Sequence, residues 1–142
     1  ADAASMTLLS NKKIQENGYI ARAKIISVAT VNDDPLLVLS GCIIATQKIL
    51  SQNNLKVSDV DLFEIHEAFA STMVHCQKEL KIDDAKLNVN GGCIALGHPM
   101  GATGSIMMST LVDELERRDL ATGIVATSGA AGAGTAILIE RI

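Results

Sequence analysis

The chain has 142 residues, of which 48% are hydrophobic and 20% are charged, and its formal net charge is −4. A single domain of this length can bury about two-thirds of the surface that its unfolded form exposes. Because nearly half of the residues are hydrophobic and few are charged, the chain can fill such a core, and the composition excludes a disordered protein. Lysine and arginine are scattered without a basic run, which argues against binding to nucleic acid or to an anionic membrane. Apolar stretches end before the roughly 20 residues that a membrane-spanning helix needs, so we expect a soluble protein.

The cysteines predict a reducing environment. Cys42, Cys76 and Cys93 show neither CxxC spacing nor a metal-finger pattern, so we expect free thiols and no metal site. No secretion signal precedes them, and the expected compartment is the cytoplasm, or the mitochondrial matrix in a eukaryote. The chain begins with Ala1 rather than with methionine and opens inside a strand-like pattern. We therefore expect a piece of a longer protein.

Hydrophobic periodicity predicts strands that alternate with helices in one domain over residues 1–142. The expected strands cover residues 4–10, 21–31, 60–65, 123–128 and 135–142. The expected helices cover residues 11–17, 36–50 and 68–80, and a fourth helix ends at Arg118. Pro35 is tolerated at the first position of a helix and marks the start of the second. This order predicts an α/β fold with three layers, mostly parallel strands and one antiparallel partner.

Three residues that can do chemistry lie at the predicted ends of strands, where reactive groups gather in open α/β sheets. His66 ends one strand, Ser128 ends another, and His98 lies between Gly97 and Pro99 in a glycine-rich loop. A purely structural role for His66, as a cap of the next helix, is the alternative to a catalytic one. The loop could also cradle a phosphate, but it has neither a GKS/GKT end nor GxGxxG in a strand–helix turn.

Two strings carry a resemblance to a known family. NVNGGCIALGHPMGATGS, at residues 88–105, resembles the glycine-histidine signature of thiolases, which make or cleave 3-ketoacyl coenzyme A thioesters. IHEAFA resembles the family's Asn-Glu-Ala-Phe segment, with His66 in place of the asparagine. ATQKIL, DVDLFEIHEAFA and GAGTAILIE follow in family order, so the resemblance covers essentially the whole chain. It covers only the C-terminal half of the enzyme.

The resemblance implies a thiolase half-domain, a three-layer α/β/α fold with a five-stranded mixed sheet. Its expected partners are an acyl coenzyme A substrate, an N-terminal domain of the same chain that carries the nucleophilic cysteine, and further copies in a homodimer or tetramer. No nucleic acid, no membrane and no cofactor beyond the coenzyme A thioester substrate is expected. The isolated piece is expected to be inactive, because the residue that accepts the acyl group lies elsewhere.

The resemblance also implies roles for individual residues. His98 would activate the nucleophilic cysteine and hold the thioester oxygen as its charge grows. His66 would complete that oxyanion site, directly or through a water. Phe69 and Ala68 would contact the acyl substrate, with Phe69 as a wall of the pocket. The backbone N–H of Ala130 would form a second oxyanion site.

The sequence departs from the family at Ser128, which stands where thiolases keep a second cysteine that moves the α-proton of the acetyl group. A serine hydroxyl is far too weak an acid to replace a thiol without a strong partner. Cys93 falls at a variable position of the signature, and we assign it a structural role. The alternatives are a catalytically silent thiolase-like subunit, a coenzyme A thioester binding protein, and a ketoacyl synthase, which the HEAFA and GHPMGATGS strings disfavour.

Overall fold

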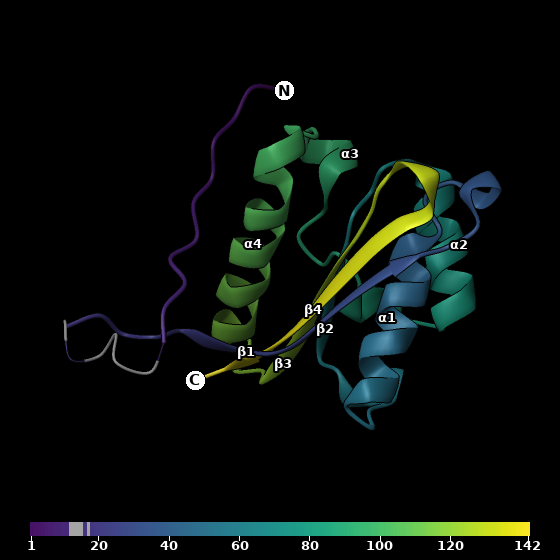
Figure 1. Ribbon diagram of the computed structural model, residues 1–142. Coiled ribbons are helices and arrows are strands. Elements are labelled where there is room, and N and C mark those ends of the chain that lie inside the picture. Colours follow the sequence, from purple (N-terminus) through teal and green to yellow (C-terminus); the bar gives the residue numbers. More distant parts are fainter. Residues whose placement is uncertain (12–15, 17) are drawn as a thin grey trace.

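A computed structural model describes residues 1–11, 16 and 18–142 of the chain (Figure 1). The strands are β1 (Ala23–Asn32), β2 (Leu62–Ile65), β3 (Thr122–Ser128) and β4 (Ala133–Arg141). The helices are α1 (Gly41–Gln52), α2 (Ala70–Leu80), α3 (Cys93–Leu96) and α4 (Thr103–Arg117). In this described part of the chain, no helix has the length and apolar character needed to cross a membrane.

The sheet is mixed and open, with the strand order β1-β4-β3-β2. Only β2 and β3 pair in parallel, whereas β1 with β4 and β3 with β4 pair antiparallel. The predictions of five strands and of a mostly parallel sheet are therefore wrong for the described residues. Beyond the β2 edge, Leu87 adds a single isolated bridge to Phe63 rather than a fifth strand.

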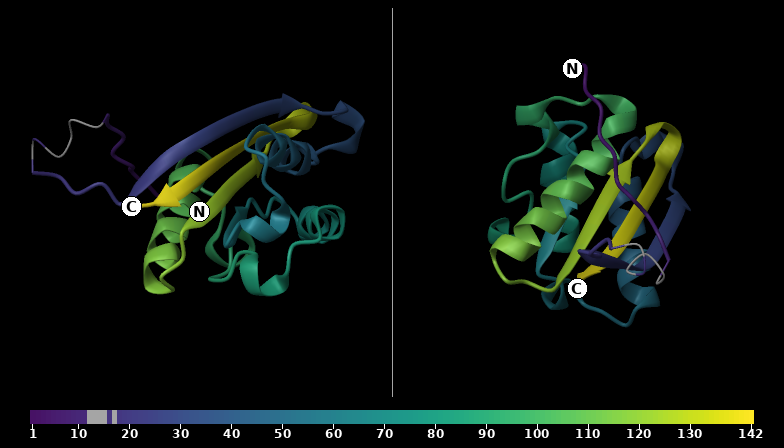
Figure 2. Two further views of the ribbon diagram at one scale, coloured as in Figure 1. Left: turned by 90° about the horizontal axis from the view of Figure 1, so that it is seen from below. Right: turned by 90° about the vertical axis from the view of Figure 1, so that its left-hand side faces the viewer.

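The segment at residues 4–10 forms no strand, contrary to the prediction. It passes along the outside of α4 (Figures 1 and 2), where the Ser5 hydroxyl donates to the Ala102 carbonyl at 2.7 Å. The apolar side chains of Met6, Leu8 and Leu9 are exposed. An apolar run becomes a strand only beside a sheet edge that can pair with it, and this run lies against a helix. The predicted helix at residues 11–17 falls on residues 12–15 and 17, outside the described residues.

The second predicted helix begins later than expected. Pro35–Leu37 forms only a short 3₁₀ turn, in which the Asp34 carboxylate accepts from the Leu36 N–H at 2.9 Å. Val38 and Leu39 then adopt positive φ angles of 21° and 72°, which interrupt the helical path. The helix starts at Gly41, where a Cβ would lie 2.3 Å from the Ala133 carbonyl oxygen, so only glycine allows α1 to approach β4 this closely.

Helices cover both faces of the sheet, which confirms the three-layer prediction. In Figure 1, α1 and α2 lie on one side of the strands and α4 lies on the other. The core on the α1 and α2 side includes Ile49, Phe63, Ile65, Cys76, Ile124 and Leu138. The core on the α4 side includes Leu62, Leu111, Leu115, Val125 and Ile139. Because β2 and β3 are parallel, their carboxyl ends lie at the same edge of the sheet.

Candidate functional site

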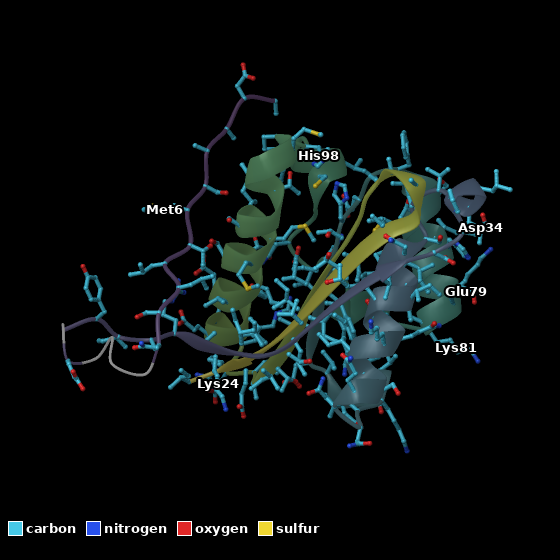
Figure 3. All side chains as sticks on the ribbon, viewed as in Figure 1. Met6, Lys24, Asp34, Glu79, Lys81 and His98 are labelled. Atoms are coloured by element: carbon cyan, nitrogen blue, oxygen red, sulfur yellow. The ribbon has the colours of Figure 1, made fainter. Side chains whose placement is uncertain are left out.

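Two of the predicted site residues lie at the carboxyl ends of the parallel strands β2 and β3. His66 comes after the last residue of β2, and its backbone N–H donates to the Ala126 carbonyl of β3 at 2.9 Å. Ser128 is the last residue of β3. His98 lies beside α3, close to the beginning of α4 (Figure 3). The prediction that His66, His98 and Ser128 converge at one end of the sheet is confirmed.

The two histidine rings are in contact. Their centroids lie 4.4 Å apart, with an interplanar angle of 43°. His66 is buried, with 5% of its surface exposed, whereas His98 is exposed. Burial, and then the nearby His98, lower the pKa of His66. His66 is therefore held as the neutral imidazole near pH 7.

One ring nitrogen of His66 is unpartnered. Its buried Nε2 has no hydrogen-bond partner among the described residues. The backbone of Ser128 lies close enough to act on the pKa of the ring, in the direction that favours the protonated form. A neutral imidazole carries a lone pair on one of its two nitrogens. With that lone pair on Nε2, His66 can accept a proton, bind a cation or hold a water there.

His98 is held from its other side by the start of α4. Its Nδ1 lies 2.8 Å from the Thr103 hydroxyl. Gly97, which precedes it, has a φ of 91°, a conformation that favours glycine and lets the chain leave α3 sharply. The exposed His98 ring thus keeps Nε2 for a ligand or a substrate.

Cys93 joins this pair, although we assigned it a structural role from the sequence. Its Sγ and one ring nitrogen each of His66 and His98 lie within 4.8 Å of one another. The thiol is half-buried, and burial raises its pKa. The sequence held one signal for this contact, since Cys93 and His98 share the same glycine-rich loop. Cys42 and Cys76 are buried elsewhere, and all three cysteines are free thiols, as expected.

Asn88 and Glu67 tie the end of β2 to the glycine-rich loop, a connection that the sequence did not reveal. The Asn88 side chain accepts from the Ile65 N–H at 2.8 Å and donates to the Ile65 carbonyl and to Glu67 Oε1, both at 2.9 Å. Glu67 Oε2 accepts from the Ile94 N–H at 2.9 Å. At Gly92, a Cβ would lie 2.5 Å from the Glu67 carboxyl carbon. This network fixes the position of His66 relative to His98.

The hydroxyl of Ser128 is bonded to the start of α1. It donates to the Leu39 carbonyl at 2.8 Å and accepts from the Cys42 N–H, also at 2.8 Å. Ser128 is buried, and both bonds hold the first turn of α1 against the end of β3. Its backbone contacts His66, while its side chain is engaged with α1. An acid–base role for the hydroxyl stays a prediction.

The residues predicted to contact substrate lie around this edge. Phe69 immediately precedes α2 and is 64% exposed, and the Ala68 N–H donates to the His66 carbonyl at 3.0 Å. Ala130 is exposed in the short turn after β3, where Ala131 has a φ of 58°. Phe69 and Ala130 are thus accessible to a substrate at this edge of the sheet. The roles of Phe69, Ala68 and Ala130 in substrate binding stay predictions.

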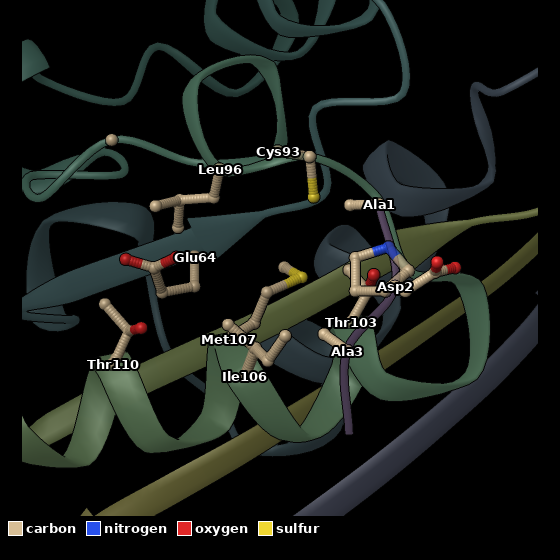
Figure 4. Close-up of a pocket in the computed structure, with 13 residues that line it drawn as sticks. Ala1, Asp2, Ala3, Glu64, Cys93, Leu96, Thr103, Ile106, Met107 and Thr110 are labelled. Atoms are coloured by element: carbon tan, nitrogen blue, oxygen red, sulfur yellow. The ribbon is translucent and has the colours of Figure 1, made fainter. Parts of the chain in front are cut away.

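A cavity of about 150 Å³ lies behind Cys93, between the glycine-rich loop and α4 (Figure 4). Glu64 lines it from β2, and Ala1, Asp2 and Ala3 line it from the N-terminal segment. Burial, together with the negative charges of Glu67 and Glu114, raises the pKa of Glu64 to about 8. Glu64 is therefore mainly protonated at neutral pH, in contrast to an ordinary glutamate.

Comparison with known proteins identifies close relatives. Residues 19–141 match the family described as "Thiolase, C-terminal domain". The 3-ketoacyl-CoA thiolase of Serratia proteamaculans is 42% identical over 99% of this chain, which spans 37% of that protein. The steroid 3-ketoacyl-CoA thiolase of Mycobacterium tuberculosis is 39% identical over the whole of this chain and 35% of its own length. The crystal structure of the Bacillus anthracis acetyl-CoA acetyltransferase superposes with a TM-score of 0.87 at 37% identity, covering 94% of this chain and 34% of that one.

Proposed function

Because the chain belongs to the thiolase C-terminal domain family, we propose that it supplies the histidine side of an acyl-transfer site for coenzyme A thioesters. The chain spans little more than a third of the relatives it matches, so the complete site requires a second domain. The observation that carries the proposal is the pair formed by His66 and His98 at the carboxyl ends of β2 and β3. The expected substrates are 3-ketoacyl coenzyme A in the cleavage direction and acetyl coenzyme A in the condensation direction.

In this proposal His98 is the base that activates a cysteine of the N-terminal domain. Thr103 orients its ring through Nδ1, so that Nε2 can accept the thiol proton. The thiolate then attacks the 3-keto carbon. The bond between C2 and C3 breaks, which leaves the acyl group on the cysteine and releases acetyl coenzyme A, whose C2 takes up a proton. In the second half-reaction coenzyme A loses its thiol proton to His98 and takes up the acyl group, and the cysteine leaves as a thiolate.

The unpartnered Nε2 of His66 supports one of the two oxyanion roles that we expected. This nitrogen is buried and has no hydrogen-bond partner among the described residues, so a water can bind to it. A water held by the Nε2 lone pair can donate its own hydrogen to the substrate oxygen. We therefore assign His66 the water-mediated role in the oxyanion site.

A chimera tests this proposal. Residues 1–142 replace the corresponding third of the Bacillus anthracis acetyltransferase, whose remaining chain provides the N-terminal part. We expect the chimera to cleave acetoacetyl coenzyme A or at least to form the acyl-enzyme from acetyl coenzyme A, and the isolated 142-residue chain to do neither. A folded chimera that is not acylated would contradict the proposal.

One observation favours a second candidate, a catalytically silent thiolase-like subunit. The Ser128 hydroxyl is bonded to Leu39 and Cys42 rather than to the histidine pair, so it is poorly placed to move the α-proton. If the chain is such a silent subunit, the chimera forms the acyl-enzyme from acetyl coenzyme A, which leaves the α-carbon untouched, but does not cleave acetoacetyl coenzyme A. Ser128→Cys then restores turnover, because a thiol has a pKa that can be tuned toward neutrality, and acid–base assistance contributes about 10² to 10⁴ in rate.

A further inference from the structure

His66, Cys93 and His98 form a set of donors that the acyl-transfer proposal does not fully use. We propose that His66 Nε2, Cys93 Sγ and His98 Nε2 bind a divalent cation of the zinc class. We expected no metal site because the sequence lacks short Cys and His spacings. The structure builds the set from two segments instead, the end of β2 and the glycine-rich loop. A cation on His98 Nε2 would occupy the atom that acts as the base in the proposed function, so metal binding and acyl transfer exclude each other at this site. The cobalt titration of the 142-residue chain tests the cation site apart from acyl transfer.

The distances fit a three-ligand site. Cys93 Sγ and one ring nitrogen each of His66 and His98 lie within 4.8 Å of one another. In a tetrahedral zinc site with bonds of about 2.0–2.3 Å, neighbouring ligand atoms are about 3.3–3.8 Å apart. The remaining gap can be closed by a small rotation of the exposed His98 ring. Two imidazoles and one thiolate leave the fourth position for a water.

The hydrogen bonds around the donors are those that a metal site requires. Histidine ligands almost always use their second ring nitrogen to bond a backbone carbonyl or a side chain, which fixes the ring and its tautomer. The Thr103 hydroxyl does this for His98, whose Nδ1 it contacts at 2.8 Å. The lone pair on His66 Nε2 is buried and has no partner among the described residues. A cation at this point would satisfy it.

The charge of the surroundings also favours a cation. The Glu67 carboxylate lies close enough to Cys93 to act on it electrostatically, whereas Glu64 is mainly protonated at neutral pH and adds little charge. Binding converts the neutral Cys93 thiol to a thiolate and releases one proton to solvent. Since the metal brings two positive charges, the net charge of the site rises by only one. The exposed side of His98 provides the entry path. Soft and borderline donors of this kind disfavour Mg²⁺, which requires oxygen ligands.

Cobalt titration of the 142-residue chain with reduced thiols tests the site, because tetrahedral thiolate-bound Co²⁺ absorbs in the visible and near-ultraviolet. We expect one Co²⁺ per chain with a thiolate-to-metal absorption band, displacement by Zn²⁺, and no competition from Mg²⁺. Cys93→Ala and His98→Gln should each lower the affinity by more than about 100-fold, since even the loss of an orienting partner costs about 10–100-fold. Thr103→Val should lower it by about 10–100-fold.

Matched controls come from the same chain. His75→Gln, on the exposed face of α2, and Cys76→Ala, in the core, remove the same functional groups away from the site and should leave the affinity unchanged. Circular dichroism verifies that each variant is folded. If Cys93→Ala does not fold, Zn²⁺ protection of Cys93 in the unmodified chain against iodoacetamide, measured by peptide mass spectrometry, replaces it. Co²⁺ binding that persists without Cys93, the absence of a thiolate band, or alkylation of Cys93 at the same rate with and without Zn²⁺ would overturn the proposal.

Discussion

The ring of His66 lies 4.4 Å from that of His98, centroid to centroid, although His66 is buried at the end of a strand and His98 is exposed on a loop. Two imidazoles this close cannot both carry a positive charge without repulsion. Because His66 is also the more buried of the two, it is the one whose protonation is suppressed. The pair therefore presents one neutral ring, which accepts, beside a second ring that remains in contact with solvent.

The titration of His66 should report this contact. Burial is the largest cause of its lowered pKa and His98 is the second, so we expect His66 to titrate below the ordinary value of about 6.5. His98→Gln should raise the pKa of His66, but only part of the way, because burial remains. Ring resonances followed by two-dimensional NMR against pH measure both values, with His75→Gln as the control that leaves His66 unchanged. Titration of His66 at or above the ordinary value would contradict the described contact.

The Asn88 network should contribute strongly to stability. Asn88→Ala leaves the buried Ile65 N–H and carbonyl without their partners and should lower the free energy of unfolding by about 3 kcal/mol. Asn88 has a φ of 43°, so part of any loss could come from placing alanine in a left-handed conformation. Asn54→Ala controls for this, because Asn54 has a φ of 54° and an exposed side chain, and it should cost only about 1 kcal/mol. Denaturant unfolding of both variants measures the difference, and equal losses would refute the network's role.

Gly92 should be required for the position of Glu67. An alanine Cβ there would lie 2.5 Å from the Glu67 carboxyl carbon and would displace a carboxylate that bonds both Asn88 and Ile94. We expect Gly92→Ala to lower the free energy of unfolding by about 1–3 kcal/mol. Gly104→Ala is the matched change, since its Cβ meets nothing within 4 Å in α4, and it should stabilise the chain by about 0.5–1 kcal/mol. Thermal unfolding of the two variants should therefore shift in opposite directions.

Glu64 should make the chain less stable as the pH rises. Its pKa is raised to about 8 in the folded chain, against about 4.3 when unfolded, so between these values the folded state holds a proton that the unfolded state has lost. The free energy of unfolding then falls with pH by up to about 1.4 kcal/mol per pH unit from this group.

Glu64→Gln removes this dependence, so its stability relative to the unmodified chain should rise between pH 5 and pH 8 and level off above pH 8. Glu140→Gln makes the same charge change on the exposed side of β4 and provides the control. Denaturant unfolding at a series of pH values gives the difference. A constant difference between the Glu64 variant and the unmodified chain would show that Glu64 is ionised in the fold.

Local patterns predicted most of the elements and the two histidines, but not how segments meet. β-branched runs such as residues 21–31 predict a strand and give no information on its direction, so the antiparallel pairing of β1 with β4 was missed. The apolar run at residues 4–10 has a strand pattern but no sheet edge to pair with. The break before α1 depends on the positive φ of Val38 and Leu39, which neither residue type signals.

In the candidate site, too, local motifs could be predicted from the sequence, but the contacts between segments could not. His66 and His98 could be predicted because each stands in a motif beside a strand end or a glycine-rich turn. The contact of Cys93 with His66, and the bonds of Asn88 to Ile65 and Glu67, join segments that are distant in sequence. The bonding of the Ser128 hydroxyl to the start of α1 likewise arises only after the chain folds.

The most direct test of the account is the rate of acyl-enzyme formation in the chimera, followed in a rapid-mixing experiment with acetyl coenzyme A, whose transfer to the cysteine does not involve the α-carbon. His98→Gln should slow this step by about 10² to 10⁴, because it removes the base that activates the thiol. His75→Gln, which removes an exposed histidine of α2 outside the site, should leave the rate unchanged. If His98→Gln forms the acyl-enzyme as fast as the unmodified chimera, His98 is not the activating base, and the assignment of this edge of the sheet to acyl transfer is wrong.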